Sequence, residues 1–315
     1  MRLRHALLLV PFLSAPVFGE AIAWKTQWPD ALAEAKAGKK CALLFFFNDG
    51  VKYSKQFEAE TLTNEKVIAA MRQYVCARID PEGPDEDNAL WQKHQMPKLP
   101  ATYIYDPSGT QLAIVRAFKA EGFAGALEAI APAYASQIAP AREALAKDPE
   151  QADALAKLGA AYVKLDNPAE SAKQYAKAAD ALAKKGDKAR ALTLMGEQLN
   201  TFFDLKWFTY TRECCKKIAE LDPADASKMG AKAAWAQGMA DCDDRKLKDA
   251  IAVLKPACEK YKDSDLRAQM MFTLASAYMY SGDKPTAVQV FEAIIKEYPD
   301  SDTAKLAETQ ASKLK

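Results

Sequence analysis

The fold is decided by a stretch that reads Phe45-Phe46-Phe47-Asn48-Asp49-Gly50-Val51-Lys52-Tyr53-Ser54-Lys55-Gln56-Phe57-Glu58. It continues the apolar residues 41–44, and so long an apolar run is typical of a strand buried on both faces of a sheet. Asn-Asp-Gly then supplies turn residues. Residues 52–73 carry apolar side chains at helical spacing, with a break predicted at 63–65. The stretch therefore predicts a buried strand, a turn and a helix in direct succession.

The residues around this stretch continue the alternation of strands and helices. A short helix begins near Trp28, and residues 74–80 are the next predicted strand. Residues 99–105 and 111–118 flank an Asp-Pro-Ser-Gly turn, which predicts a hairpin. A helix over 122–137 follows. This order predicts an α/β domain with a mixed sheet and helices on both faces.

Two motifs of this region carry a family resemblance. Phe57-Glu58-x-Glu60-Thr61-Leu62 follows the turn closely, and Pro100 stands between Leu99 and Ala101-Thr102-Tyr103. Both resemble exported thioredoxin-like proteins, over residues 23–138. In that family the first motif follows the second Cys of a C-x-x-C pair, and a cis-proline faces the pair. The resemblance implies that Pro100 is the cis-proline and places the former active-site turn at Val51, Lys52, Tyr53 and Ser54.

No thiol stands at these four positions, and this departure from the family decides the expected chemistry. Thiol–disulfide exchange requires a thiolate that attacks a disulfide, which neither Val51 nor Ser54 supplies. Cys41 and Cys76 lie near the starts of predicted strands, away from the helix N-terminus that lowers a thiol pKa. We predict two reduced, buried thiols, with a disulfide between them as the alternative if their strands are neighbours. We also predict no catalytic residue and a redox-inactive domain. The alternative is a thiol–disulfide oxidoreductase or isomerase-like chaperone that uses Cys41 or Cys76.

Other catalytic and metal-binding patterns are missing from the sequence. His94 is the one histidine beyond residue 5, and its place at a helix end predicts a surface side chain. It has no neighbouring cysteines that would complete a zinc pattern. The acidic loop 82–87 lacks the ligand spacing of a calcium loop, and no phosphate-binding glycine motif occurs. We therefore expect no metal and no cofactor.

The N-terminus reads as a secretory signal peptide over residues 1–19, with cleavage between 19 and 23. Arg2 and Arg4 make a basic start, and the apolar run over 6–18 is too short to span a bilayer. No later run is long enough either, so no integral membrane segment is expected after cleavage. These features predict an exported bacterial protein, either periplasmic or secreted.

The second half of the chain is self-similar and helical. After Pro140 it is rich in Ala, Lys and Leu, with a period below 40 residues. Its best copy resembles a tetratricopeptide repeat and reads Met271-x-x-Leu274-Ala275-x-x-Tyr278, then Ala287-x-x-x-Phe291-x-x-Ile294, then Pro299. We predict an all-α array of four helix pairs over 152–301, namely 152–185, 189–225, 229–264 and 268–301. Residues 139–151 would be a helical linker and 302–315 a capping helix.

The resemblance to tetratricopeptide repeats also implies a binding groove lined by the first helix of each pair. The groove positions would include Asn200, Phe203, Trp235, Met239, Phe272, Met279 and Tyr280. Aromatic and Met side chains are enriched at binding surfaces, yet Trp235 and Phe272 fit the core of neighbouring repeats equally well. Such a groove would take an extended peptide or an amphipathic helix.

The functional prediction combines these parts. Lys and Arg total 43 against 42 for Asp and Glu, a net charge of +1 that gives no support for a nucleic-acid partner. We predict an exported, non-enzymatic protein-interaction or scaffold protein whose partner is a protein or peptide. The former cleft beside Pro100 would serve as a second docking surface. A structural spacer in an envelope assembly is the remaining alternative.

Overall fold

The computed structural model describes residues 22–314 and divides into two compact units, with the boundary in the sequence between Pro132 and Ala133. The predicted signal peptide lies outside the described residues. Pro132 falls inside helix α5 (Ala120–Ala133), where it removes a backbone donor. The chain continues as the π-helical turn η2 (Tyr134–Ile138), so the predicted closing helix over 122–137 changes its hydrogen bonding near its end.

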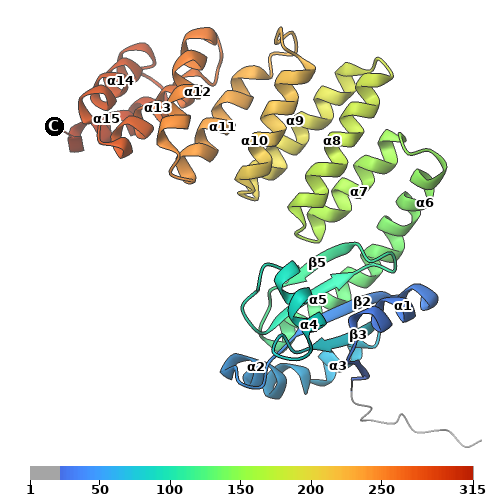
Figure 1. The fold of residues 1–315 in the computed structure, drawn as a ribbon. Helices are drawn as coiled ribbons and strands as arrows, with labels where there is room; N and C mark the ends of the chain where they lie inside the picture. The colour runs from blue at the N-terminus through green and yellow to red at the C-terminus, as the bar shows by residue number, and fades with distance from the viewer. Residues whose placement is uncertain (1–21, 315) are drawn as a thin grey trace, which may run out of the picture. The chain divides into compact units, whose positions relative to one another are not determined.

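The first unit is an α/β domain with a five-stranded mixed sheet of order β1-β3-β2-β4-β5 (Figure 1). Parallel pairing joins β2 to β3 and β1 to β3, whereas β4 runs antiparallel to β2 and to β5. This confirms the predicted fold class. Besides α5, its elements are β1 (Trp24–Lys25), α1 (Trp28–Gly38), β2 (Cys41–Phe46), α2 (Lys52–Phe57), η1 (Glu58–Leu62), α3 (Glu65–Met71), β3 (Tyr74–Ile79), α4 (Asp85–Lys93), β4 (Ala101–Tyr105) and β5 (Gln111–Val115).

Strand β2 lies at the centre of this sheet, and every residue of it is buried. Phe45 points to the face covered by α2, where its ring centroid lies 5.6 Å from that of Phe57. Phe57 in turn contacts Phe123 of α5 at 5.1 Å. Phe46 points to the opposite face, in one apolar cluster with Ala31 of α1. Helices therefore cover both faces, which is why an uninterrupted apolar run suits this strand.

The helix predicted over 52–73 is interrupted, as the sequence indicated. Asn64 begins a new helix, because its side chain accepts a hydrogen bond from the Lys66 backbone N–H at 3.0 Å. The π-helical turn η1 before it was not predicted. Thr61, within η1, donates from its hydroxyl to the Phe118 carbonyl at 2.7 Å, which ties the turn to the segment after β5.

The second unit is a succession of antiparallel helix pairs, and neighbouring helices from α7 to α15 pack against one another (Figure 1). Among residues 22–314, no helix combines the length and apolar composition required to cross a bilayer. The helices are α6 (Ala139–Lys147), α7 (Ala152–Lys164), α8 (Pro168–Lys184), α9 (Lys188–Asp204), α10 (Phe208–Leu221), α11 (Gly230–Asp243), α12 (Leu247–Lys260), α13 (Arg267–Ser281), α14 (Lys284–Glu297) and α15 (Asp302–Leu314).

Within the pairs, a small residue on the first helix stands 16 positions before a large one on the second. Gly159 precedes Tyr175 in this way, and Gly238 precedes Leu254. A Cβ atom added at Gly238 would lie 2.4 Å from Leu254 Cγ, and one at Gly159 would lie 2.7 Å from the Tyr175 ring. In the next pair the larger residue comes first: Leu199 stands 16 positions before Cys215, and both are buried in one apolar cluster. Complementary volumes at this crossing hold each pair at close range.

Candidate functional site

The turn after β2 is fixed by hydrogen bonds to the end of β3. The buried Asn48 side chain donates to Asp80 Oδ1 at 2.9 Å and accepts from the Gly50 N–H at 2.7 Å. The Asn48 N–H donates to Ser54 Oγ at 3.5 Å. These bonds hold the start of α2 against the carboxyl ends of β2 and β3.

The former active-site positions lie at the start of α2. Val51 is half-buried and precedes the first helical residue, while Lys52 and Tyr53 are exposed. Ser54 is fully buried, and its hydroxyl oxygen already accepts a backbone hydrogen bond. The turn therefore presents a branched apolar side chain, a cation and a phenol, without an accessible thiol or aliphatic hydroxyl that could act as a nucleophile.

A cavity of about 490 Å³ lies beside the end of α2, within the first unit. The peptide bond between Leu99 and Pro100 is cis, and Pro100 lines the cavity. We call this space the Pro100 cavity and define it by the lining residues Phe57, Pro97, Lys98, Pro100, Arg116 and Phe118.

Aromatic contacts connect the cavity to the former active-site turn. The Phe118 ring lies 5.3 Å from the Phe57 ring and 6.4 Å from that of Tyr53. Sequence reasoning identified Tyr53 and Pro100 but missed Lys98, Arg116 and Phe118. The available signal was the position of Arg116 and Phe118 at the end of the second strand of the predicted hairpin, because loops at strand ends carry functional side chains.

The cysteines of the first unit are separate, buried thiols. Cys41 pairs with Tyr74 across β2 and β3, whereas Cys76 pairs with Leu43. Both thiols are free, as the sequence favoured, and burial raises the pKa of each to about 12. The Cys76 thiol lies 3.6 Å from the Met71 carbonyl, to which it donates. Both side chains are therefore protonated near neutral pH.

The prediction of a surface His94 was wrong. Its ring is half-buried and lies 4.6 Å from the Tyr103 ring and 5.1 Å from the Phe46 ring. Nδ1 is 2.7 Å from the Leu90 carbonyl, and Nε2 forms a hydrogen bond with the Tyr105 hydroxyl. Burial lowers the pKa of His94. The aromatic residues of β4 face this helix end and draw the ring inward, so His94 is a packing residue.

The predicted groove residues occupy α9, α11 and α13 of the second unit. The Phe203 ring lies 5.6 Å from the Trp235 ring, which joins α9 to α11. The Thr273 hydroxyl of α13 donates a hydrogen bond to Met239 Sδ of α11 at 3.4 Å. All of these predicted positions are half-buried except Asn200 and Tyr280, which are exposed.

Phe272 and Tyr280 differ within α13. The Phe272 ring lies 5.4 Å from that of the fully buried Phe291 of α14, and Phe272 packs with Met279 against the core of the last repeats. Tyr280 is 61% exposed, with the Arg245 guanidinium 5.6 Å from its ring centroid. The half-buried set thus combines packing within the array with a surface that a partner can reach.

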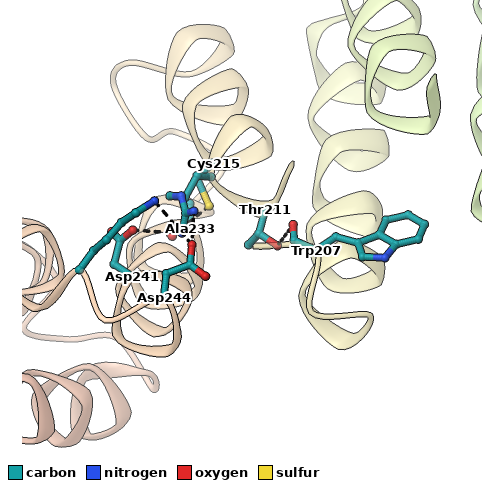
Figure 2. A network of polar contacts seen from close by, with 8 residues as sticks. Trp207, Thr211, Cys215, Ala233, Asp241 and Asp244 are labelled. Carbon is teal, nitrogen blue, oxygen red and sulfur yellow. Dashed lines mark hydrogen bonds and ion pairs between the residues drawn. The ribbon is translucent and has the colours of Figure 1, made fainter. Parts of the chain in front are cut away.

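A polar network joins α10 to α11 (Figure 2). Arg212 Nη1 lies 3.2 Å from Asp241 Oδ1, and its other Nη atom pairs with Asp244. The Cys215 thiol donates to the Ala233 carbonyl at 3.2 Å. Burial raises the pKa of Asp241, and Arg212 acts in the opposite direction. The network fixes the second helix pair to the third. Over the described residues, no group of three or more His, Cys, Asp or Glu side chains could hold a metal ion.

Comparison with family models finds one match in each of the two units. A thioredoxin-like family model matches residues 23–107, and a tetratricopeptide-repeat model matches residues 269–301. The chain joins a thioredoxin-like domain to tetratricopeptide repeats. A search of curated proteins returned no significant match.

Solved structures similar to the two parts are distant in sequence. A thioredoxin from Thermus thermophilus shares 19% identity over 35% of this chain and 86% of its own, with a TM-score of 0.32. YrrB, a tetratricopeptide-repeat protein with an unusual peptide-binding site, shares 19% identity over 59% and 89%, with a TM-score of 0.38. The DsbH oxidoreductase shares 19% over 35% and 81%, with a TM-score of 0.29.

Proposed function

We propose that this protein is an exported, non-enzymatic interaction protein, in which a redox-inactive thioredoxin-like domain accompanies a repeat array that binds a protein or peptide. The observation that carries the proposal is the chemistry of the turn before α2. Val51 and Ser54 stand where the family's thiols are expected, and the Ser54 hydroxyl is buried and hydrogen-bonded.

The environments of the six cysteines support the absence of thiol exchange. A thiol attacks a disulfide only as its thiolate. Burial raises the pKa of Cys215 to about 12 and the pKa values of Cys242 and Cys258 to about 11. Burial also raises the pKa of Cys214 and the pKa values of Cys41 and Cys76 in the first unit. Near neutral pH each thiolate is therefore a very small fraction of the total.

The first prediction concerns reduction of insulin disulfides by dithiothreitol. We expect the purified protein to leave the rate at that of dithiothreitol alone. A Val51→Cys/Ser54→Cys variant is the matched control, because it restores a thiol pair at the start of α2 and is expected to accelerate the reaction. Turnover by the unaltered protein that disappears in Cys41→Ala or Cys76→Ala would overturn the proposal in favour of an oxidoreductase.

Binding by the array is supported by side chains that are neither fully buried nor fully exposed. Phe203, Trp235 and Met239 keep part of their surface accessible on neighbouring first helices. Aromatic and Met residues are the types enriched in protein interfaces, and a tetratricopeptide repeat is present at 269–301. Together these features favour recognition of a protein or peptide over a purely spacing role.

The second prediction separates recognition from spacing. We expect a partner retained by the immobilised protein from an envelope extract to be lost with Trp235→Ala and reduced with Tyr280→Ser. The exposed position of Tyr280 means that its replacement leaves folding intact. Leu306→Ala is the matched control, since Leu306 is also exposed but lies on α15, outside the predicted groove. Equal retention by all variants would favour the spacer.

Export rests on the sequence of residues 1–19. A basic start, a short apolar run and small residues near position 19 support cleavage and release beyond the cytoplasmic membrane. Cell fractionation tests this directly. We expect a C-terminally tagged chain in the periplasm or medium, shortened at its N-terminus, whereas deletion of residues 2–19 should retain it in the cytoplasm.

A further inference from the structure

The charged residues that line the Pro100 cavity are all basic. Lys98 enters the lining from the segment before Pro100, and Arg116 enters it from the end of β5. No Asp or Glu belongs to the lining. Over the part of the chain that the structure describes, Lys98 makes no ion pair. The cavity therefore has an apolar floor of Phe57 and Phe118 and a positively charged rim.

The surface around this cavity has the composition of a protein contact. Tyr53 is 63% exposed against the Phe118 ring, and Met96 is 59% exposed one residue before Pro97. Large apolar side chains with this exposure are rare among the described residues. Tyr, Phe, Met and Arg are the residue types enriched in interfaces.

We propose that the Pro100 cavity binds a segment of a partner protein in which an apolar side chain is followed directly by carboxylate residues. The apolar side chain would enter the cavity between Phe57, Pro100 and Phe118. The cavity volume of about 490 Å³ is large enough for a large side chain with its backbone. The carboxylates would pair with Lys98 and Arg116 at the rim. This inference rests on the proposed non-enzymatic role, because it gives the domain a binding partner in place of a disulfide substrate.

Charge complementarity selects an acidic segment over other peptides. Opposite charges across a binding rim set orientation and exclude partners of the wrong sign. Lys52 and Lys55, both exposed on α2, have the same sign as the two lining cations and add to the positive charge of this helix. A small inorganic anion would satisfy the cations but leave the aromatic floor exposed to water.

The test uses the purified protein and two fluorescein-labelled pentapeptides, Ala-Phe-Asp-Glu-Ala and Ala-Phe-Lys-Arg-Ala, in an anisotropy titration at low salt. We expect the acidic peptide to bind about tenfold more tightly than the basic one, since two rim charge pairs each contribute a severalfold factor. Lys98→Glu/Arg116→Glu is expected to reverse this preference. Raising the salt concentration should weaken binding of the acidic peptide.

Matched variants keep the result interpretable. Lys66→Glu/Arg72→Glu makes the same change in net charge at an exposed position of α3 and at the exposed residue directly after it, outside the cavity lining, and should keep the preference. Trp235→Ala should leave pentapeptide binding unchanged, so failure of array recognition and failure of this inference are distinguishable. Equal affinities for the two peptides, no binding at millimolar peptide, or an unchanged preference in Lys98→Glu/Arg116→Glu would overturn the inference.

Discussion

Replacing Arg212 by alanine is expected to lower the free energy of unfolding of the repeat array by about 3 kcal/mol at pH 7. Asp241 is 2% exposed, and the Arg212 guanidinium is the cation paired with its carboxylate (Figure 2). Loss of this cation leaves a carboxylate that is cut off from both water and a counter-charge. Urea unfolding followed by circular dichroism at 222 nm measures the change.

The loss should depend on pH in a defined direction. Burial raises the pKa of Asp241 in the folded state, so the folded state holds a proton more readily than the unfolded state. The contribution of this group to stability is then greatest below its unfolded pKa and falls as pH rises through its folded pKa. Without Arg212 the folded pKa rises further. The penalty of Arg212→Ala is therefore expected to shrink between pH 7 and pH 4.

Two further variants distinguish the contribution of the buried Arg212–Asp241 pair to stability from that of the Arg212–Asp244 pair. Asp244 is the other partner of Arg212, and its side chain is partly exposed. Asp244→Ala should therefore lower the free energy of unfolding by less than about 1 kcal/mol. Arg212→Met/Asp241→Leu replaces the pair with apolar side chains and should regain most of the stability lost in Arg212→Ala. If Arg212→Ala and Asp244→Ala are equally mild, the buried pair is not what fixes α10 to α11.

Local patterns in the sequence predicted the elements that depend on near neighbours. The apolar run of β2 needs helices on both faces, which the structure places there. The helix break at Asn64 follows from the capping chemistry of an Asn side chain. The spacing of Leu274, Ala275 and Tyr278 specifies a helix-pair crossing, and that segment lies within the match to a tetratricopeptide repeat.

Features that depend on residues distant in the sequence could not be predicted from local patterns. Strand β1 has only two residues, and it exists through pairing with Cys76 and Ala77 of β3. Lys98 and Arg116 reach one cavity because the β4–β5 hairpin returns the chain beside Pro100. Such placements arise from tertiary packing, which no periodicity of the single sequence encodes.

Replacing Gly238 by alanine is expected to lower the free energy of unfolding by about 2 kcal/mol, although alanine is the better helix former by about 1 kcal/mol. The added Cβ would lie 2.4 Å from Leu254 Cγ and 2.6 Å from each Leu254 methyl carbon. Leu254 is fully buried, so it cannot move aside without disturbing its neighbours. Overlap in a close-packed crossing therefore outweighs helix propensity.

A double-mutant cycle shows whether this contact is the cause. Leu254→Ala alone should cost about 3 kcal/mol through loss of burial and the cavity that remains. In Gly238→Ala/Leu254→Ala the new methyl group occupies part of that cavity, so the combined loss should be smaller than the sum by about 1–2 kcal/mol. Gly125→Ala is the control, because a Cβ there meets nothing within 4 Å, and it should be neutral or stabilising. Additive losses in the double mutant would contradict the view that Gly238 is there to admit Leu254 and that paired volumes set the helix spacing of the array.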